Sequence, residues 1–283
     1  MKEHITESSR IVQLRMLLDR NNAAVLVVEG QEDKKLIESR LEHGLEIMCA
    51  GGRNAVLDAA RTLKGDSVFR NVRYLIDSDF DRFHNEWYDH SNKNDPYPSG
   101  VFSTGEHDLW MECIEADNQL LERAMSGYVE KIRDARSLVS KALGFARRIS
   151  GLKLAADLLG YKLEYKSCNN PNLTEGSWDY DFLIAFFLKQ NKGCEVDRSH
   201  WIEIAEQIVD RLGILYTKPT GDHLLFLLLA SLCGGKRRAG ERDIRRSVYS
   251  ALDADSILHI RCIQEINYWC AEAGVQGLRP YGT

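Results

Sequence analysis

Long apolar runs are absent from this sequence. The longest, Leu224–Leu232, falls well short of the roughly 20 residues that cross a bilayer, and it predicts a buried helix instead. Residues Met1–Arg20 mix charged with apolar side chains and lack the apolar core of a signal peptide. We therefore expect a cytoplasmic protein with no membrane contact.

Cysteine patterns that build scaffolds or zinc sites are also lacking. The seven cysteines are an odd number with wide, irregular gaps, and neither a CxxC pair nor a zinc-type Cys/His spacing occurs. A disulfide framework is excluded for a chain of 283 residues with such spacing. Reduced thiols, as in the cytoplasm, are expected.

Neither sign of charge dominates the chain. Lys and Arg number 37 against 42 Asp and Glu, which excludes a surface that is basic everywhere and grips nucleic acid with all of it. A content of 44% hydrophobic residues with a net charge of −5 excludes disorder. The most concentrated basic stretch consists of Lys236, Arg237, Arg238, Arg242, Arg245 and Arg246. It predicts contact with an RNA or DNA backbone or, alternatively, a solvated helix face.

The first third of the chain alternates short apolar runs with helical segments. The runs, each expected to be a buried strand, are Ala24–Val28, Leu45–Cys49, Val72–Ile76 and a weaker Gly100–Ser103. Apolar side chains at helical spacing predict helices over Glu32–His43, Asn54–Gly65 and Glu106–Met125. This alternation predicts an α/β fold with a parallel sheet flanked by helices.

From about residue 120 helical patterns dominate. They cover Arg123–Ile149, Trp178–Lys189, Ser199–Leu212, Asp222–Cys233, Glu241–Leu252 and Ser256–Ala273. The sequence thus predicts an α/β catalytic domain at residues 1–120 and a mainly α-helical part at residues 121–283, for contacts with substrate, partner or a second copy. Helices packed onto the same core, without a true second domain, are the alternative.

Carboxylates directly follow two of the expected strands. Glu29 comes after the first strand, and Asp77, Asp79 and Asp81 come after the third. Ligands of open parallel sheets bind beyond the carboxyl ends of the strands, where crowded carboxylates stay ionised only beside a cation or a basic group. Asp77 and Asp79 face the same way in extended backbone, so the pair can share one Mg²⁺ or Mn²⁺ ion. The alternative is that all these acids are solvated loop residues.

These residues carry a family resemblance. The segments Val27–Asp33 and Tyr74–Asp81 resemble the TOPRIM domain, the topoisomerase-primase module, in which a glutamate after the first strand and a DxD motif after the third bind Mg²⁺. Ala50–Asn54 and Thr104–Leu109 are similar to stand-alone TOPRIM proteins related to the nuclease half of overcoming-lysogenization-defect proteins. The resemblance covers about residues 24–110.

The resemblance implies metal-assisted phosphodiester hydrolysis by a Mg²⁺-dependent endonuclease. Glu29, Asp77 and Asp79 would hold one or two ions, directly or through water. It further implies a toxic effector of bacterial anti-phage defence, a homodimer that cleaves tRNA after activation or release by an ABC-type ATPase sensor subunit. Strand passage is not expected, because the chain is too short for a topoisomerase and no tyrosine stands in a recognisable nucleophile context.

Other acidic and basic residues near the strand ends have two interpretations each. Asp33 is either a second-metal ligand or a charge favoured at a helix N-terminus, and Asp81 is either a metal ligand or a solvated loop residue. Arg53 and Asn54 follow a Gly-Gly turn at a helix start, where an anionic substrate would bind. Asn54 could instead cap that helix.

Two further features follow the third strand. His107 and Asp108 stand at the next strand-to-helix junction, where a second metal or a proton donor is expected, although such a pair is often only surface. The segment Arg82–Ser99 is longer than a tight link, and its aromatic residues Trp87, Tyr88 and Tyr97 predict base stacking or a lid. Packing of these aromatics against one another is the alternative.

Two rival functions stay open from the sequence. The first is a DNA nuclease or nickase on the same fold, which differs from the tRNA nuclease only in substrate. The second is a non-catalytic module that docks on an ATPase and whose acidic site is structural. Loss of hydrolysis after removal of the metal or of Glu29 separates the enzymes from the docking module.

Overall fold

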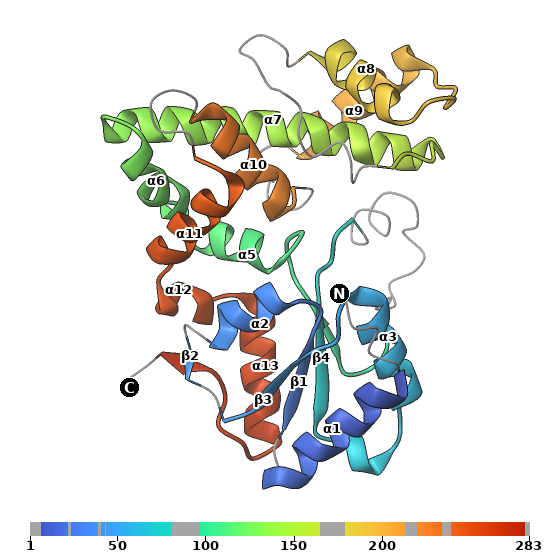
Figure 1. The fold of residues 1–283 in the computed structure, drawn as a ribbon, viewed down its shortest axis with the longest axis vertical. Helices are drawn as coiled ribbons and strands as arrows, with labels where there is room; N and C mark the ends of the chain where they lie inside the picture. Colours follow the sequence, from blue (N-terminus) through green and yellow to red (C-terminus); the bar gives the residue numbers. More distant parts are fainter. Residues whose placement is uncertain are drawn as a thin grey trace. The chain divides into compact units, whose positions relative to one another are not determined.

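A four-stranded sheet organises the N-terminal part of the chain in the computed structural model (Figure 1), which describes residues 7–21, 24–38, 41–42, 44–80, 97–164, 179–212, 220–233 and 239–280. Its strands are β1 (Val25–Val28), β3 (Glu46–Cys49), β4 (Val72–Ile76) and β5 (Val101–Ser103). They are all parallel and lie in the order β3-β1-β4-β5. The prediction of a parallel sheet flanked by helices is confirmed.

Helices cover both faces of this sheet (Figure 1). They are α1 (Glu7–Asn21) and α3 (Arg53–Thr62) on one face and α2 (Gln31–Glu38) and α13 (Arg261–Glu272) on the other. Leu14 of α1 and Val56 of α3 share an apolar cluster with Tyr74 of β4. The preceding residue, Arg73, points to the opposite face, where its guanidinium lies 5.2 Å from the Trp269 ring centre of α13. Because both faces are covered, the strands are apolar almost throughout.

The strand order places a topological switch point between β1 and β4. After β1 the chain passes through α2 to β3 on one side, and after β3 it crosses to β4 on the other side of β1. The connections at the carboxyl ends of β1 and β4 therefore diverge, and open parallel sheets bind their ligands at such a point. Glu29 and Asp77 are the first residues after these two strands.

The chain divides into two compact units, Met1–Ala116 with Asp253–Thr283, and Asp117–Leu252. The sequence prediction placed residues 253–283 with the helical half, whereas α13 packs against β5 of the sheet. The first unit also contains α5 (Leu109–Ala116), α12 (Ala254–Leu258) and the short η1 (Ser67–Phe69). A small antiparallel pair of β2 (Leu41–Glu42) and β6 (Arg279–Pro280) joins its two chain segments.

In the described residues of the second unit, the regular structure is helical throughout and is joined by turns and loops. Its elements are α6 (Leu120–Met125), η2 (Ser126–Tyr128), α7 (Ile132–Leu158), α8 (Tyr180–Gln190), α9 (Arg198–Leu212), α10 (Asp222–Leu232) and α11 (Glu241–Ala251). The 27-residue α7 packs against both α9 and α10. In the described part of the chain, no helix has the length and apolar character needed to cross a membrane.

Four predicted helices have different bounds in the structure. The segment Glu32–His43 forms α2 only as far as Glu38, and Leu41–Glu42 within it is the strand β2. The segment Glu106–Met125 forms α5 and α6. Asp108 precedes α5 and accepts a hydrogen bond from the Met111 amide at 2.9 Å, and Asp117 lies between the two helices and accepts one from the Gln119 amide at 3.1 Å. The segment Ser256–Ala273 is divided into α12 and α13 near Ile260. The helix predicted over Arg123–Ile149 begins at Ile132 and continues to Leu158. Gly151, inside this helix, lies so close to Ala205 and Val209 of α9 that a side chain would not fit.

Candidate active site

Glu29 and Asp77 meet at the switch point of the sheet. The Asp77 amide donates a hydrogen bond to Glu29 Oε1 at 2.9 Å. The Asp77 side chain in turn accepts a hydrogen bond from the Leu109 amide at the start of α5, with Oδ1 at 3.3 Å. The structure thus brings together two carboxylates that lie 48 residues apart in the sequence.

A glycine turn holds the end of β1 in place. The amides of Gly51 and Gly52 donate to the Glu29 carbonyl at 3.1 and 2.9 Å. Their φ angles of 86° and 130° favour glycine, since side chains rarely adopt such a backbone. Gly52 is the N-cap residue of α3, and Asn54 is an exposed residue inside the helix. The prediction that Asn54 caps the helix is therefore wrong.

Asp79 adopts a left-handed backbone with φ 46°, which among non-glycine residues Asp and Asn tolerate best. Its amide donates to the His107 carbonyl at 2.9 Å, which fixes this conformation. Its half-exposed carboxylate lies 3.1 Å from the Arg53 guanidinium and 3.9 Å from His107 Nδ1. The second aspartate of the DxD motif is thus placed between two basic side chains.

Arg53 connects several parts of the site. Besides its ion pair with Asp79, it donates a hydrogen bond to the Asp77 carbonyl. Its guanidinium also lies 3.4 Å from the Tyr97 hydroxyl and 5.7 Å from the centre of that ring. The predicted contact of Arg53 with substrate stays a prediction, since in this structure the side chain is engaged with the protein.

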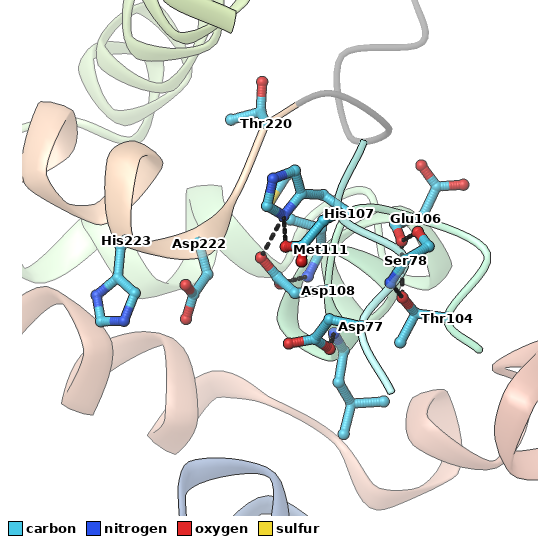
Figure 2. A network of polar contacts seen from close by, with 12 residues as sticks. Asp77, Ser78, Thr104, Glu106, His107, Asp108, Met111, Thr220, Asp222 and His223 are labelled. Atoms are coloured by element: carbon cyan, nitrogen blue, oxygen red, sulfur yellow. Dashed lines mark hydrogen bonds and ion pairs between the residues drawn. The ribbon is translucent and has the colours of Figure 1, made fainter. Parts of the chain in front are cut away.

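His107 and Asp108 lie in the loop between β5 and α5, where their side chains face each other (Figure 2), and His107 also lies close to Asp79. His107 Nδ1 is 3.3 Å from Asp108 Oδ2, and the imidazole packs edge-on against Phe80 with ring centres 5.3 Å apart. Asp108 is 8% exposed and His107 is partly buried, so the pair is not a surface pair. The geometry allows Asp108 to orient the imidazole toward the half-exposed Asp79.

Two residues that the sequence analysis missed join the loops after β4 and β5. The Ser78 amide donates to Thr104 Oγ1 at 2.9 Å, and the Thr104 hydroxyl donates to the Glu106 carbonyl at 2.8 Å. The Ser78 hydroxyl donates to the same carbonyl (Figure 2). A signal existed in the sequence, because Thr104 is the first residue after β5, as Glu29 is after β1 and Asp77 is after β4.

The remaining predicted site residues are placed differently or not described. Asp33 Oδ2 accepts a hydrogen bond from the Gly30 amide at 2.9 Å at the start of α2, which agrees with the helix-terminus interpretation. Asp81 lies outside the described residues, as do most of the aromatic segment and the basic residues Lys236, Arg237 and Arg238. Of the aromatic segment's three named residues, Tyr97 alone is described, and it contacts Arg53.

Burial raises the pKa of Glu29 to about 7. The hydrogen bond from the Asp77 amide and the charge of Arg53 oppose this increase, while repulsion by Asp79 and Asp33 adds to it. A carboxyl group with such a pKa holds its proton in part at neutral pH. A cation bound beside it would release that proton.

Burial also raises the pKa of Asp77, well above its ordinary value. Repulsion by Asp108, Asp33, Glu29 and Asp79 adds to the increase. Five carboxylates therefore act on one another at this edge of the sheet. Among the residues that the structure describes, Lys and Arg form no ion pair with the carboxylates of Glu29 and Asp77.

The chemistry of this edge fits Mg²⁺ or Mn²⁺, because carboxylate oxygens are the ligands that these hard cations prefer. Glu29, Asp77 and Asp79 supply such oxygens and an excess of negative charge. In the described part of the chain, however, the present side-chain positions give no group of three or more His, Cys, Asp or Glu residues that could hold an ion. The Arg53 guanidinium lies against Asp79, so binding of an ion by all three carboxylates requires Asp79 to turn from Arg53.

The chain was compared with protein-family models and with curated proteins. No protein-family model matches the chain, and no curated protein matches it. The functional interpretation therefore depends on the geometry above and on the sequence resemblance.

Proposed function

We propose that the protein is a Mg²⁺-dependent endonuclease of the TOPRIM type. The observation that supports this most directly is the hydrogen-bonded approach of Glu29 and Asp77 at the switch point of a parallel sheet. The two carboxylates come from the strand ends that the family motif specifies, and burial and mutual repulsion raise the pKa values of both. Such a site gains free energy when it takes up a divalent cation.

In this proposal Glu29, Asp77 and Asp79 hold the metal through their carboxylate oxygens. A bound Mg²⁺ or Mn²⁺ supplies a Lewis acid for the phosphoryl oxygen and lowers the pKa of an attacking water. His107, oriented by Asp108 at 3.3 Å, donates a proton to the leaving oxygen. Arg53, once it parts from Asp79, binds a phosphate of the substrate.

The expected biological setting comes from the resemblance alone. Within the family the chain resembles the TOPRIM effector of the PARIS anti-phage system, which has an ABC-type ATPase partner. We infer a cytoplasmic homodimer that acts as a toxic effector and cleaves tRNA. Contact of the basic stretch around Arg242 and Arg246 with the RNA backbone belongs to the same proposal, and both side chains are exposed on α11.

A nuclease assay with purified protein tests the proposal. tRNA and supercoiled plasmid are incubated separately with Mg²⁺, with Mn²⁺ or with EDTA. We expect cleavage of tRNA that EDTA abolishes and that Glu29→Gln lowers at least 100-fold. Glu46→Gln, at an exposed position on β3, serves as the matched control. Metal-dependent cleavage that Glu29→Gln leaves unchanged would contradict the assigned site, and a preference for plasmid would favour the DNA nuclease.

The ion pair between Arg53 and Asp79 favours a second candidate, a docking module without catalysis. In that case Arg53 is the permanent counter-ion of the acidic site, and no metal enters. This candidate predicts no hydrolysis at any metal concentration. It also predicts that a partner ATPase binds the double variant Asp77→Asn, Asp79→Asn as tightly as it binds the wild type.

A further inference from the structure

Two buried hydroxyl residues join the loops that carry the proposed site. We define the Ser78–Thr104 brace as the side chains of Ser78 and Thr104 together with the carbonyl of Glu106, which both hydroxyls contact (Figure 2). Thr104 is 0% exposed and Ser78 is 2% exposed. Water therefore does not replace these hydrogen bonds when one of them is removed.

Each end of the brace is adjacent to proposed site residues. Ser78 lies between Asp77 and Asp79, and Glu106 directly precedes His107. A third link runs in parallel, because the Asp79 amide donates to the His107 carbonyl at 2.9 Å. Together these hydrogen bonds determine where Asp79 lies relative to His107 and hold its left-handed backbone, a conformation that persists only when its surroundings impose it.

A buried glutamate anchors the same loop from the other side. Glu112, 5% exposed, accepts hydrogen bonds from the Gly105 amide through Oε1 and from the Cys262 thiol through Oε2, the latter at 3.0 Å. Cys262 belongs to α13, so the C-terminal segment of the unit takes part in holding the loop. Burial and the neighbouring Glu112 raise the pKa of the Cys262 thiol, which stays a donor.

We propose that Thr104 is a positioning residue of the metal site. Its hydroxyl accepts from the loop after β4 and donates to the loop after β5, and it thereby fixes the backbone from which the Asp77 and Asp79 side chains reach toward an ion. This inference rests on the proposed function, since it assumes that the site binds a metal. An exchange of the hydroxyl for a methyl group keeps the volume of the side chain and removes both hydrogen bonds.

Binding of Mn²⁺ to the purified full chain, followed by electron paramagnetic resonance, tests this role. We expect Thr104→Val to weaken Mn²⁺ binding at least tenfold, and Thr104→Ser, which keeps the hydroxyl, to stay within threefold of the wild type. Ser78→Ala removes one hydrogen bond of the brace and should give an intermediate loss. The matched control is Thr220→Val, which removes another fully buried threonine hydroxyl, paired with Ser150 at 3.3 Å in the other unit.

The outcomes separate this inference from the proposed function. If Thr104→Val binds Mn²⁺ like the wild type, or if Thr220→Val weakens binding as much at a similar loss of melting temperature, Thr104 is only a stabilising residue and the inference is wrong. If the wild type binds no Mn²⁺, both the inference and the proposed metal site are wrong. Should Thr104→Val not fold, the comparison of Ser78→Ala with Thr104→Ser decides in the same way.

Discussion

The two units of the protein each contain a cluster of acidic side chains, and the clusters differ in how their charge is balanced. In the sheet unit, the carboxylates of Glu29 and Asp77 accept backbone amides and repel one another. In the helical unit, the buried Asp222 forms an ion pair with Arg245 at 2.6 Å, and Glu241 lies 3.3 Å from the same guanidinium. Burial opposes the charge of Arg245, but these carboxylates outweigh it and raise its pKa.

The difference indicates which cluster is suited to bind a cation. Asp222 already has its positive partner, and the Arg245 guanidinium also lies 5.1 Å from the Phe226 ring centre, so this cluster joins α10 to α11. Near Asp77, Arg53 donates to the backbone carbonyl of that residue and forms its ion pair with the more exposed Asp79. A buried carboxylate without a charged partner costs folding free energy and is retained where it binds a ligand. Four predictions test this contrast.

Removal of Asp222 should have the largest effect on stability. Asp222→Ala leaves the mostly buried Arg245 without its main partner, and we expect a loss of about 3 kcal/mol in the free energy of unfolding. Urea denaturation measures this loss. The control is Asp58→Ala, which removes an exposed ion pair with Arg61 and should cost below about 0.5 kcal/mol. A similarly small loss of unfolding free energy for Asp222→Ala would contradict the conclusion that Asp222 and Arg245 balance each other's charge.

Removal of the charge of Asp77 should, in contrast, increase the free energy of unfolding. In EDTA at pH 8, Asp77→Asn relieves the repulsion among the carboxylates and keeps the oxygen that accepts the Leu109 amide. We expect the free energy of unfolding to increase, because the burial and the repulsion that raise the pKa of Asp77 both disfavour its charged form. Added Mg²⁺ should raise the melting temperature of the wild type and not of this variant. A loss of stability in EDTA would show that the Asp77 charge is compensated.

The pKa of Glu29 gives a pH dependence that can be measured without metal. Its folded-state pKa of about 7 lies above the ordinary value of 4.5. The stability that the protonated carboxyl contributes is therefore complete below about pH 4.5 and is lost as the pH rises through about 7. Relative to Glu29→Gln, the melting temperature of the wild type in EDTA should fall between pH 5 and pH 8. A difference that is constant over this range would contradict the raised pKa.

The sequence predicts local structure well in this protein and tertiary polar contacts poorly. The apolar runs ending at Val28 and Ile76 specified buried parallel strands, and the rule that ligands bind beyond strand ends directed attention to Glu29 and Asp77. The side chains of these two residues do lie at one edge. Their metal-binding role stays a prediction.

Other features depend on contacts between distant segments, which no local pattern specifies. The bond from the Ser78 amide to Thr104 joins residues 26 positions apart, and Cys262 reaches Glu112 across 150 positions. The amphipathic pattern of α13 predicts a helix with one buried face but does not say that this face meets the sheet. The prediction that Asn54 caps α3 was wrong because Gly52, with its positive φ, is the N-cap residue and the helix begins at the residue after it.

Substitution of Arg53 should have the smallest of the four effects, and it tests whether Arg53 competes with a bound cation for Asp79. Its ion pair with the half-exposed Asp79 is worth no more than about 1 kcal/mol. Arg53→Gln removes this competitor and should tighten Mn²⁺ binding by at most about fivefold, since 1.4 kcal/mol corresponds to a factor of ten. Arg53→Lys keeps the charge and should bind Mn²⁺ like the wild type. If Arg53→Gln instead weakens binding, the hydrogen bond from Arg53 to the Asp77 carbonyl outweighs the competition, and Arg53 supports the site instead of opposing the metal.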